Sequence, residues 1–124
     1  YRAEQKLFQD SDDSRIVTII GNVNNQKKLE KILELYQIDT VYHTAAYKHV
    51  PLVEKNISAG VTCNIFGTLS CIKASLRCNV KSFVFVSTDK AVRPTNFMGA
   101  TKRFAEQILQ SINESNFKIG NITY

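Results

Sequence analysis

Short apolar runs alternate with longer amphipathic stretches along this chain. Residues 16–20 (IVTII) are apolar, mostly β-branched and followed by a glycine, a pattern typical of a buried parallel strand. Residues 24–38 carry apolar side chains at helical spacing and predict an amphipathic helix. The same criteria predict further strands at 39–47 and 81–88, the start of another within 117–124, and helices over 1–14, 58–79 and 98–115. The apolar face of the last helix is expected at Phe104, Ile108 and Ile112.

The order strand, helix, strand, helix, strand, helix predicts an α/β fold. Such alternation forms a parallel sheet with right-handed crossovers, and ligands bind at the carboxyl ends of its strands. The three strand ends carry Gly21-Asn22-Val23, His43-Thr44-Ala45-Ala46 and Ser87-Thr88-Asp89-Lys90. We therefore expect the chemistry of this protein to collect at one edge of the sheet.

Composition and charge narrow the choice of partners. The chain has 124 residues, 44% hydrophobic and 22% charged, which suits one modest globular domain. Its formal net charge of +5 is scattered rather than clustered, so we expect no nucleic-acid partner. There is no 18-residue apolar run, and we expect no membrane span within these residues. Cys63, Cys71 and Cys78 match no zinc or CxxC spacing and are interpreted as reduced core residues; we expect no metal.

The segment HTAAYKHVP joins the second strand end to a polar loop. Ala45 and Ala46 are small enough to let a flat ligand approach the backbone, although tight packing would favour them equally. Tyr47, Lys48 and His49 follow, as ligand-binding side chains or as a solvated loop. Asn64, within an otherwise apolar helical stretch, can hold a nearby loop or serve helix packing alone.

The segment VSTDKAVRPTNFMGATKR (residues 86–103) places an acid beside a lysine at the third strand end. Asp89 and Lys90 suit an elimination, in which one group removes a proton from carbon and the other protonates a leaving hydroxyl. A turn, expected from AVRPTN, must bring the two side chains to one side. The alternative is a surface ion pair of little energetic value. Met98 and Lys102 share one helix face, where methionine is usually a core residue.

Together, VYHTAAYKHVPLVEKN, CNIFGT and FVFVSTDKAVRPTNFMGATKRFAE resemble the extended short-chain dehydrogenases of the capsule and lipopolysaccharide polysaccharide-biosynthesis family, the UDP-N-acetylglucosamine 4,6-dehydratases. The resemblance runs from about residue 16 to residue 106. It implies a partial Rossmann-like sheet with flanking helices, lacking the first two strands and the C-terminal substrate domain. No G-x-G-x-x-G occurs in the chain. We therefore expect residues 1–124 to be the central part of a dinucleotide-binding catalytic domain, cut from a longer protein and inactive alone.

The resemblance also implies roles for individual residues. Lys102 matches the lysine of a Tyr-x-x-x-Lys pair that works on the nicotinamide cofactor, and Met98 stands at the tyrosine position, as in one branch of the family. Lys90 would be the base at sugar C5 and Asp89 the acid at the 6-hydroxyl, with Thr88 the candidate for the first oxidation. The remaining cofactor contacts are expected at Asn22, Val23, Ala45, Ala46, Tyr47, Asn64 and Ser87, and the substrate contacts at Lys48, His49 and Asn96.

The implied cofactor is NADP or NAD, and the implied partner is a UDP-sugar. We expect a homo-oligomer whose catalytic part is cytoplasmic, with any membrane anchor outside these residues. Two alternatives stay open. One is a related nucleotide-sugar epimerase or reductase. The other is a non-catalytic nucleotide-binding module that keeps the fold.

Overall fold

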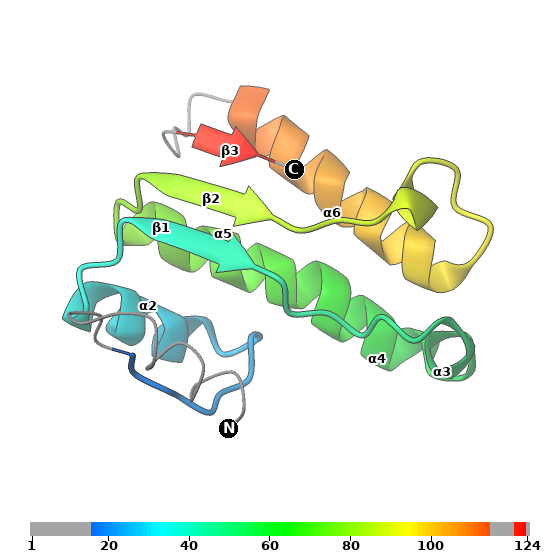
Figure 1. Cartoon of the computed structure of the whole chain (residues 1–124), viewed down its shortest axis with the longest axis horizontal. Coiled ribbons are helices and arrows are strands. Elements are labelled where there is room, and N and C mark those ends of the chain that lie inside the picture. The colour runs from blue at the N-terminus through cyan, green and yellow to red at the C-terminus, as the bar shows by residue number, and fades with distance from the viewer. Residues whose placement is uncertain (1–15, 115–120, 124) are drawn as a thin grey trace.

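A three-stranded parallel sheet forms the centre of the protein. The computed structural model describes residues 16–114 and 121–123 (Figure 1). The strands are β1 (Thr40–His43), β2 (Ser82–Phe85) and β3 (Asn121–Thr123), adjacent in the order β1-β2-β3. Thr40 is opposite Ser82, and Ser82 is opposite Asn121. The parallel α/β sheet expected from the sequence is therefore confirmed, and the start of a further strand within 117–124 is found in β3.

Helices connect and cover these strands. They are α2 (Gln26–Leu35), α3 (Val50–Lys55), α4 (Ile57–Val61), a π-helical turn η1 (Thr62–Phe66), α5 (Gly67–Arg77), a 3-10 turn η2 (Asp89–Ala91) and α6 (Phe97–Glu114). The helix expected over 58–79 is the run from α4 to α5, which η1 interrupts. The Asn25 side chain caps α2 by accepting from the Lys28 amide at 3.1 Å, and this bond satisfies a helix-terminal donor.

The core lies between the sheet and the helices behind it in Figure 1. Phe83 and Phe85 of β2 alternate with less buried neighbours and point to one face of the sheet. There they pack against Ile72 of α5 and Leu109 of α6. Burying each of these side chains contributes roughly 1.5 to 3 kcal/mol. This packing fixes the carboxyl ends of β1 and β2 relative to α5 and α6.

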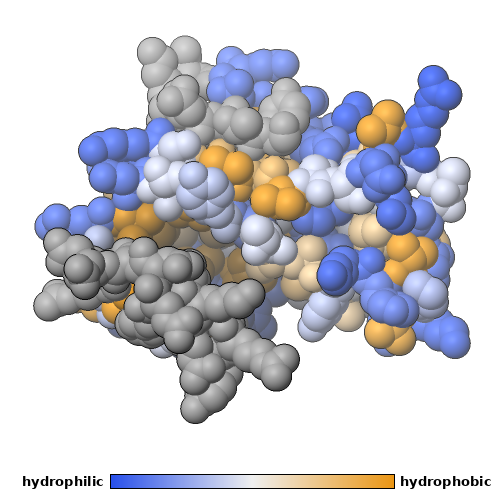
Figure 2. Space-filling model, in the orientation of Figure 1, coloured by the Kyte–Doolittle hydropathy of each residue, from blue (hydrophilic) through white to orange (hydrophobic). Residues whose placement is uncertain are grey.

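The opposite face of the sheet is open within the described residues. The side chain of Tyr42 on β1 is 71% exposed, and Val86 just beyond β2 is 46% exposed. Figure 2 shows hydrophobic residues reaching the surface at several places on the view of Figure 1, among hydrophilic ones. The helices that bury the core cluster therefore all lie on the same face of the sheet.

Two expectations are wrong in detail. Residues 16–20 form no strand, and Ile20 is 91% exposed, because no neighbouring strand pairs with this segment in the described structure. Ile108 and Ile112 of the expected face of α6 pack against the core, but Phe104 is 52% exposed, and the most buried positions include Ala105 and Leu109. The helix expected over 1–14 lies outside the described residues.

The continuous helix Ile57–Arg77 is long and apolar enough to cross a membrane by length and composition alone. Ile72 and Ala74 within it are fully buried against the sheet and its neighbouring helices. A core helix passes the same test, so this feature is weak support for a span.

Candidate functional site

The loop after β1 is held by one buried side chain, Asn64. Its Oδ1 accepts from the Tyr47 amide at 2.7 Å, and its Nδ2 donates to the Tyr47 carbonyl at 3.1 Å. The same Nδ2 donates to Thr101 Oγ1 at 2.9 Å. Asn64 is 1% exposed, so these bonds satisfy its amide in a nearly dry place. Asn64 thus ties the loop after β1 to α6, one of the two uses that the sequence left open for it.

The π-helical turn around Asn64 is linked to β1 through Thr68. The Gly67 amide reaches back to the Thr62 carbonyl, and the Thr68 hydroxyl donates to the Asn64 carbonyl at 2.7 Å. His43 Nε2 lies 2.9 Å from that hydroxyl oxygen. Because the hydroxyl proton is already donated to Asn64, the histidine is the donor in this second bond. π-Turns of this kind often occur at functional sites.

His43 is a neutral histidine within this buried network. Burial, with a smaller contribution from the Lys102 charge, lowers its pKa to about 4. Its ring stacks on Phe85 with centroids 5.8 Å apart. His43 is therefore uncharged near pH 7.

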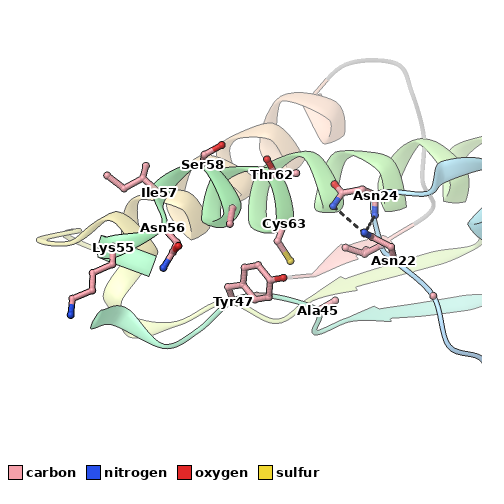
Figure 3. Close-up of a pocket in the computed structure, with 14 residues that line it drawn as sticks. Asn22, Asn24, Ala45, Tyr47, Lys55, Asn56, Ile57, Ser58, Thr62 and Cys63 are labelled. Atoms are coloured by element: carbon pink, nitrogen blue, oxygen red, sulfur yellow. Dashed lines mark hydrogen bonds between the residues drawn. The ribbon is translucent and has the colours of Figure 1, made fainter. Parts of the chain in front are cut away.

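A large open cleft of about 950 Å³ lies between the end of β1 and the α4–η1 helix. Figure 3 shows Tyr47 and Ala45 on one wall, with Cys63, Thr62 and Ser58 on the helical wall opposite. The structure brings together here the cofactor residues expected at two strand ends: Asn22, Val23, Ala45, Ala46 and Tyr47. The polar and thiol side chains of the helical wall were not predicted, because no motif marks them.

One end of this cleft is closed by the loop before α2. Asn22 Oδ1 accepts from the amide and the side chain of Asn24 at 2.9 and 3.1 Å. Val23 packs so closely on α5 that a Cβ at Gly67 would lie 2.6 Å from its Cγ1. Glycine at position 67 therefore allows the loop to approach the helix.

A second cavity, of about 300 Å³, lies at the end of β2. It is lined by Thr44, Ala46, Lys48, Val86, Ser87, Thr88, Lys90, Met98 and Lys102. Ala46 borders both cavities, so the two adjoin at the end of β1. A third cavity of about 450 Å³ continues past Lys48 and His49 to Leu52. These cavities together form an elongated depression along the carboxyl edge of the sheet.

Lys102 brings a buried positive charge to the smaller cavity. Its ammonium donates to the Val86 carbonyl at 2.9 Å and lies 4.5 Å from the centre of the Phe85 ring. Lys102 is 6% exposed, and burial lowers its pKa, while Cys63 and Glu106 act in the opposite direction. Met98, one turn earlier, is 4% exposed and lines the same cavity.

The 3-10 turn η2 brings the neighbouring acid and lysine to one side of the chain. Lys90 Nζ lies 3.3 Å from Asp89 Oδ1, and Thr88 Oγ1 donates to the same oxygen at 2.9 Å. The bonds from Thr88 and Lys90 lower the pKa of Asp89. The turn begins at Asp89, two residues before the expected AVRPTN segment, and continues into it at Ala91 and Val92. The side chains are 86% and 49% exposed, so the pair is ionised and solvated here.

Two of the predicted ligand contacts, Ser87 and Asn96, make hydrogen bonds within the protein. Ser87 lines the smaller cavity, but its hydroxyl donates to Glu106 on α6, and Glu106 also accepts from Arg103 at 3.0 Å. The Asn96 side-chain oxygen accepts from the Gly99 amide at 2.8 Å and so caps α6. Sequence reasoning missed Glu106, although its position four residues after Lys102 places both on one helix face.

The cysteines of the described residues form neither a disulfide nor part of a metal site. Cys63, Cys71 and Cys78 are all free thiols, and burial raises the pKa of Cys71 to about 11. Within residues 16–114 and 121–123, no group of three or more His, Cys, Asp or Glu side chains could hold a metal ion.

The parallel sheet with a depression at its carboxyl edge is that of a Rossmann-like protein. The chain belongs to the polysaccharide biosynthesis protein family, whose sequence pattern matches residues 1–123. It is 44% identical over 102 residues to the capsular polysaccharide biosynthesis protein CapD of Staphylococcus aureus, a match covering 82% of this chain and 17% of CapD. The family predicted from the sequence is therefore confirmed.

Two further relatives carry names that describe reactions. The UDP-N-acetylglucosamine 4,6-dehydratase (inverting) of Campylobacter jejuni is 36% identical over 94 residues, covering 76% of this chain and 28% of that enzyme. The UDP-glucose 4-epimerase of Rickettsia canadensis is 33% identical over 102 residues, covering 77% and 29%.

Solved structures agree on the fold. Pen from Bacillus thuringiensis superposes with a TM-score of 0.83 at 37% identity, covering 99% of this chain and 36% of Pen. A UDP-glucose 4-epimerase from Bifidobacterium longum, solved with NAD+ and UDP, gives a TM-score of 0.82 at 24% identity, covering 93% and 37%. The chain thus spans about a third or less of the relatives that it matches by sequence, and somewhat more than a third of these two structures.

Proposed function

We propose that this chain is the central part of the dinucleotide-binding domain of a nucleotide-sugar 4,6-dehydratase that uses NADP or NAD. The substrate would be UDP-N-acetylglucosamine and the product a 4-keto-6-deoxy sugar for surface polysaccharide synthesis. The observation that carries the proposal is the second cavity, which holds Thr88, Lys90, Met98 and Lys102 together. The dehydratase name of the Campylobacter relative supports the same reaction.

The residues present fit a nicotinamide dinucleotide. Ala45 and Ala46 leave the backbone at the end of β1 open to a flat group, and the adjoining cavities suit a long ligand. Asn22, Val23 and Tyr47 would hold its middle and adenine end, and Lys102 would bind the nicotinamide ribose. The cofactor, when bound, supplies reversible hydride uptake from the sugar. Asn64 would act on it indirectly, by fixing the Tyr47 backbone.

The elimination would be carried by Asp89 and Lys90. Lys90 Nζ removes the C5 proton, which a neighbouring ketone acidifies, and Asp89 gives its proton to the 6-hydroxyl, which leaves as water. The reaction needs a neutral amine and a neutral acid, whereas the exposed pair is ionic. Moving one proton from Lys90 to Asp89 converts one form into the other. A bound sugar that excludes water would favour the neutral form, because desolvation penalises charge.

Met98 changes the first step of the reaction. Its thioether cannot remove a proton from the sugar 4-hydroxyl. In the Tyr-x-x-x-Lys pair of the wider superfamily, the tyrosine performs that step. Thr88 Oγ1 shares the cavity with Met98 and Lys102, and it is our candidate for positioning that hydroxyl or a water beside it. The adjacent Lys102 charge would lower the pKa of a group bound there.

The test uses the complete protein that contains these residues, incubated with UDP-N-acetylglucosamine in deuterated water. We expect mass spectrometry to show loss of water together with one deuterium at C5. Deuterium at C5 with no loss of water would favour a C5 epimerase. An unchanged sugar would contradict the proposal for this substrate.

A 4-epimerase is the second candidate, and the Rickettsia relative favours it. Such an enzyme acts at C4 and needs no acid–base pair at C5 and C6. Incubation with UDP-glucose would then give UDP-galactose without deuterium at C5, and Lys90→Ala would leave turnover intact.

A further inference from the structure

One face of α6 contacts the first part of the segment that follows β2. Gly99, Lys102 and Glu106 lie at positions i, i+3 and i+7, which share a helix face. Lys102 binds the Val86 carbonyl, and Glu106 binds the Ser87 hydroxyl. Gly99 meets the loop at its far end, against the backbone of Lys90. The helix thus sets the path of the chain from Val86 to Lys90 at three points.

Of the described glycines, Gly99 leaves the least room for a Cβ atom. A Cβ at position 99 would lie 2.4 Å from the Lys90 carbonyl oxygen and 3.1 Å from its carbonyl carbon. Both atoms belong to the backbone, so no side chain can swing away to make room. The helix has no reason of its own to prefer glycine here, since alanine is favoured by about 1 kcal/mol in a helix interior.

The neighbouring contacts direct where the conflict would be relieved. The Gly99 amide is capped by Asn96, whose Oδ1 would itself lie 3.3 Å from the added Cβ. Ala91, at the other end of η2, is fully buried. The Lys90 backbone lies between Gly99, which Asn96 caps, and the buried Ala91, while the Lys90 side chain is half-exposed. A shift of the Lys90 backbone would relieve this conflict.

We propose that Gly99 is a positioning residue for Lys90, setting where the Lys90 amine lies in the smaller cavity. This rests on the proposed role of Lys90 as the base at C5. Gly99 would contact neither substrate nor cofactor and would act only through the turn at Asp89–Ala91. Any side chain at position 99 would require a shift of the Lys90 carbonyl or of the start of α6.

The experiment compares Gly99→Ala with wild type in the complete protein. We expect kcat to fall about 100-fold, the order expected for a misplacement near 1 Å, with little change in KM for the UDP-sugar. Deuterium uptake at C5 should fall in parallel. In a Lys90→Ala background, adding Gly99→Ala should cost nothing more, because the two changes act on one group. The control is Gly60→Ala, whose Cβ would lie 2.8 Å from the Val53 side chain, and we expect its kcat to be unchanged.

The outcomes separate this inference from the proposed function. Wild type that performs no dehydration removes the proposed function itself. Active wild type with an equally active Gly99→Ala, or an additive loss in the Lys90→Ala background, overturns the role of Gly99. Should Gly99→Ala fail to fold, Ala91→Gly loosens the same turn without a steric conflict. It should show the same fall in kcat at constant KM, and an unchanged kcat would overturn the proposal.

Discussion

Asn64 binds both backbone groups of Tyr47, accepting from its amide at 2.7 Å and donating to its carbonyl at 3.1 Å. The two residues come from different elements, a π-helical turn and the loop after β1. An asparagine side chain is the right length and carries both a donor and an acceptor, so it replaces the strand partner that the loop lacks.

Replacing Asn64 with alanine should therefore destabilise the chain. The change leaves the Tyr47 amide and carbonyl without this partner, and the Thr101 hydroxyl keeps only its bond to the Met98 carbonyl. We expect a loss of about 2 to 4 kcal/mol in the free energy of unfolding. Urea unfolding followed by circular dichroism measures it. Asn113→Ala, on the exposed end of α6, should change stability by less than about 0.5 kcal/mol. Equal losses in the two variants would contradict the bracing role of Asn64.

Stability should also depend on His43 below neutral pH. Its pKa is about 4 in the folded chain and near 6.5 when unfolded, so the unfolded state binds the extra proton between these values. The free energy of unfolding should fall as the pH drops through this window, by roughly 3 kcal/mol in total from this group. Urea unfolding at a series of pH values checks the slope. His43→Gln keeps a donor near Thr68 and should flatten it; a slope unchanged in this variant would refute the assignment.

The sheet and its helices could be predicted because their apolar periodicity is local. Residues 81–88 contain a short apolar run, FVFV, whose length suits a strand and is too short for a helix. β2 forms there. Residues 16–20 show the same local pattern and form no strand. A strand requires a partner, and pairing is a property of the whole sheet that no short window contains. The exposed position of Phe104 has a similar cause, since small residues such as Ala105 take the tightly packed face of α6.

The candidate site was predictable where a motif names its residues. The strand-end rule placed Ala46 and Tyr47 beside one cleft, and the resemblance pointed to Lys102 and Met98. Contacts that depend on three-dimensional packing were not predictable. Neither the hydrogen bond from Ser87 to Glu106 nor the capping of α6 by Asn96 follows from spacing alone.

Lys102 should contribute to function at the expense of stability. Its ammonium is buried, and burial lowers its pKa, because desolvation makes the charged form less favourable in the folded chain than in water. We expect Lys102→Met to leave the free energy of unfolding unchanged or higher, because methionine fills the space without a charge. In the complete protein the same change should reduce turnover at least 100-fold and weaken dinucleotide binding. Lys73→Met, on the exposed face of α5, controls for the loss of one charge. Destabilisation by more than about 1 kcal/mol would instead make Lys102 a structural residue.

Asp89 should likewise affect turnover strongly, with almost no effect on stability. Its ion pair with Lys90 is solvated, and exposed pairs contribute between 0 and about 1 kcal/mol. We expect Asp89→Asn to leave the unfolding free energy of the chain almost unchanged. In the complete protein it should reduce loss of water about 100-fold, since an amide cannot supply the proton that the 6-hydroxyl needs. Asp39→Asn is the matched control, because it breaks the exposed 2.9 Å pair with Lys81, and neither residue lines any of the three cavities. If the two variants dehydrate the sugar equally well, the Asp89–Lys90 pair is only a surface ion pair, and the acid must be sought elsewhere.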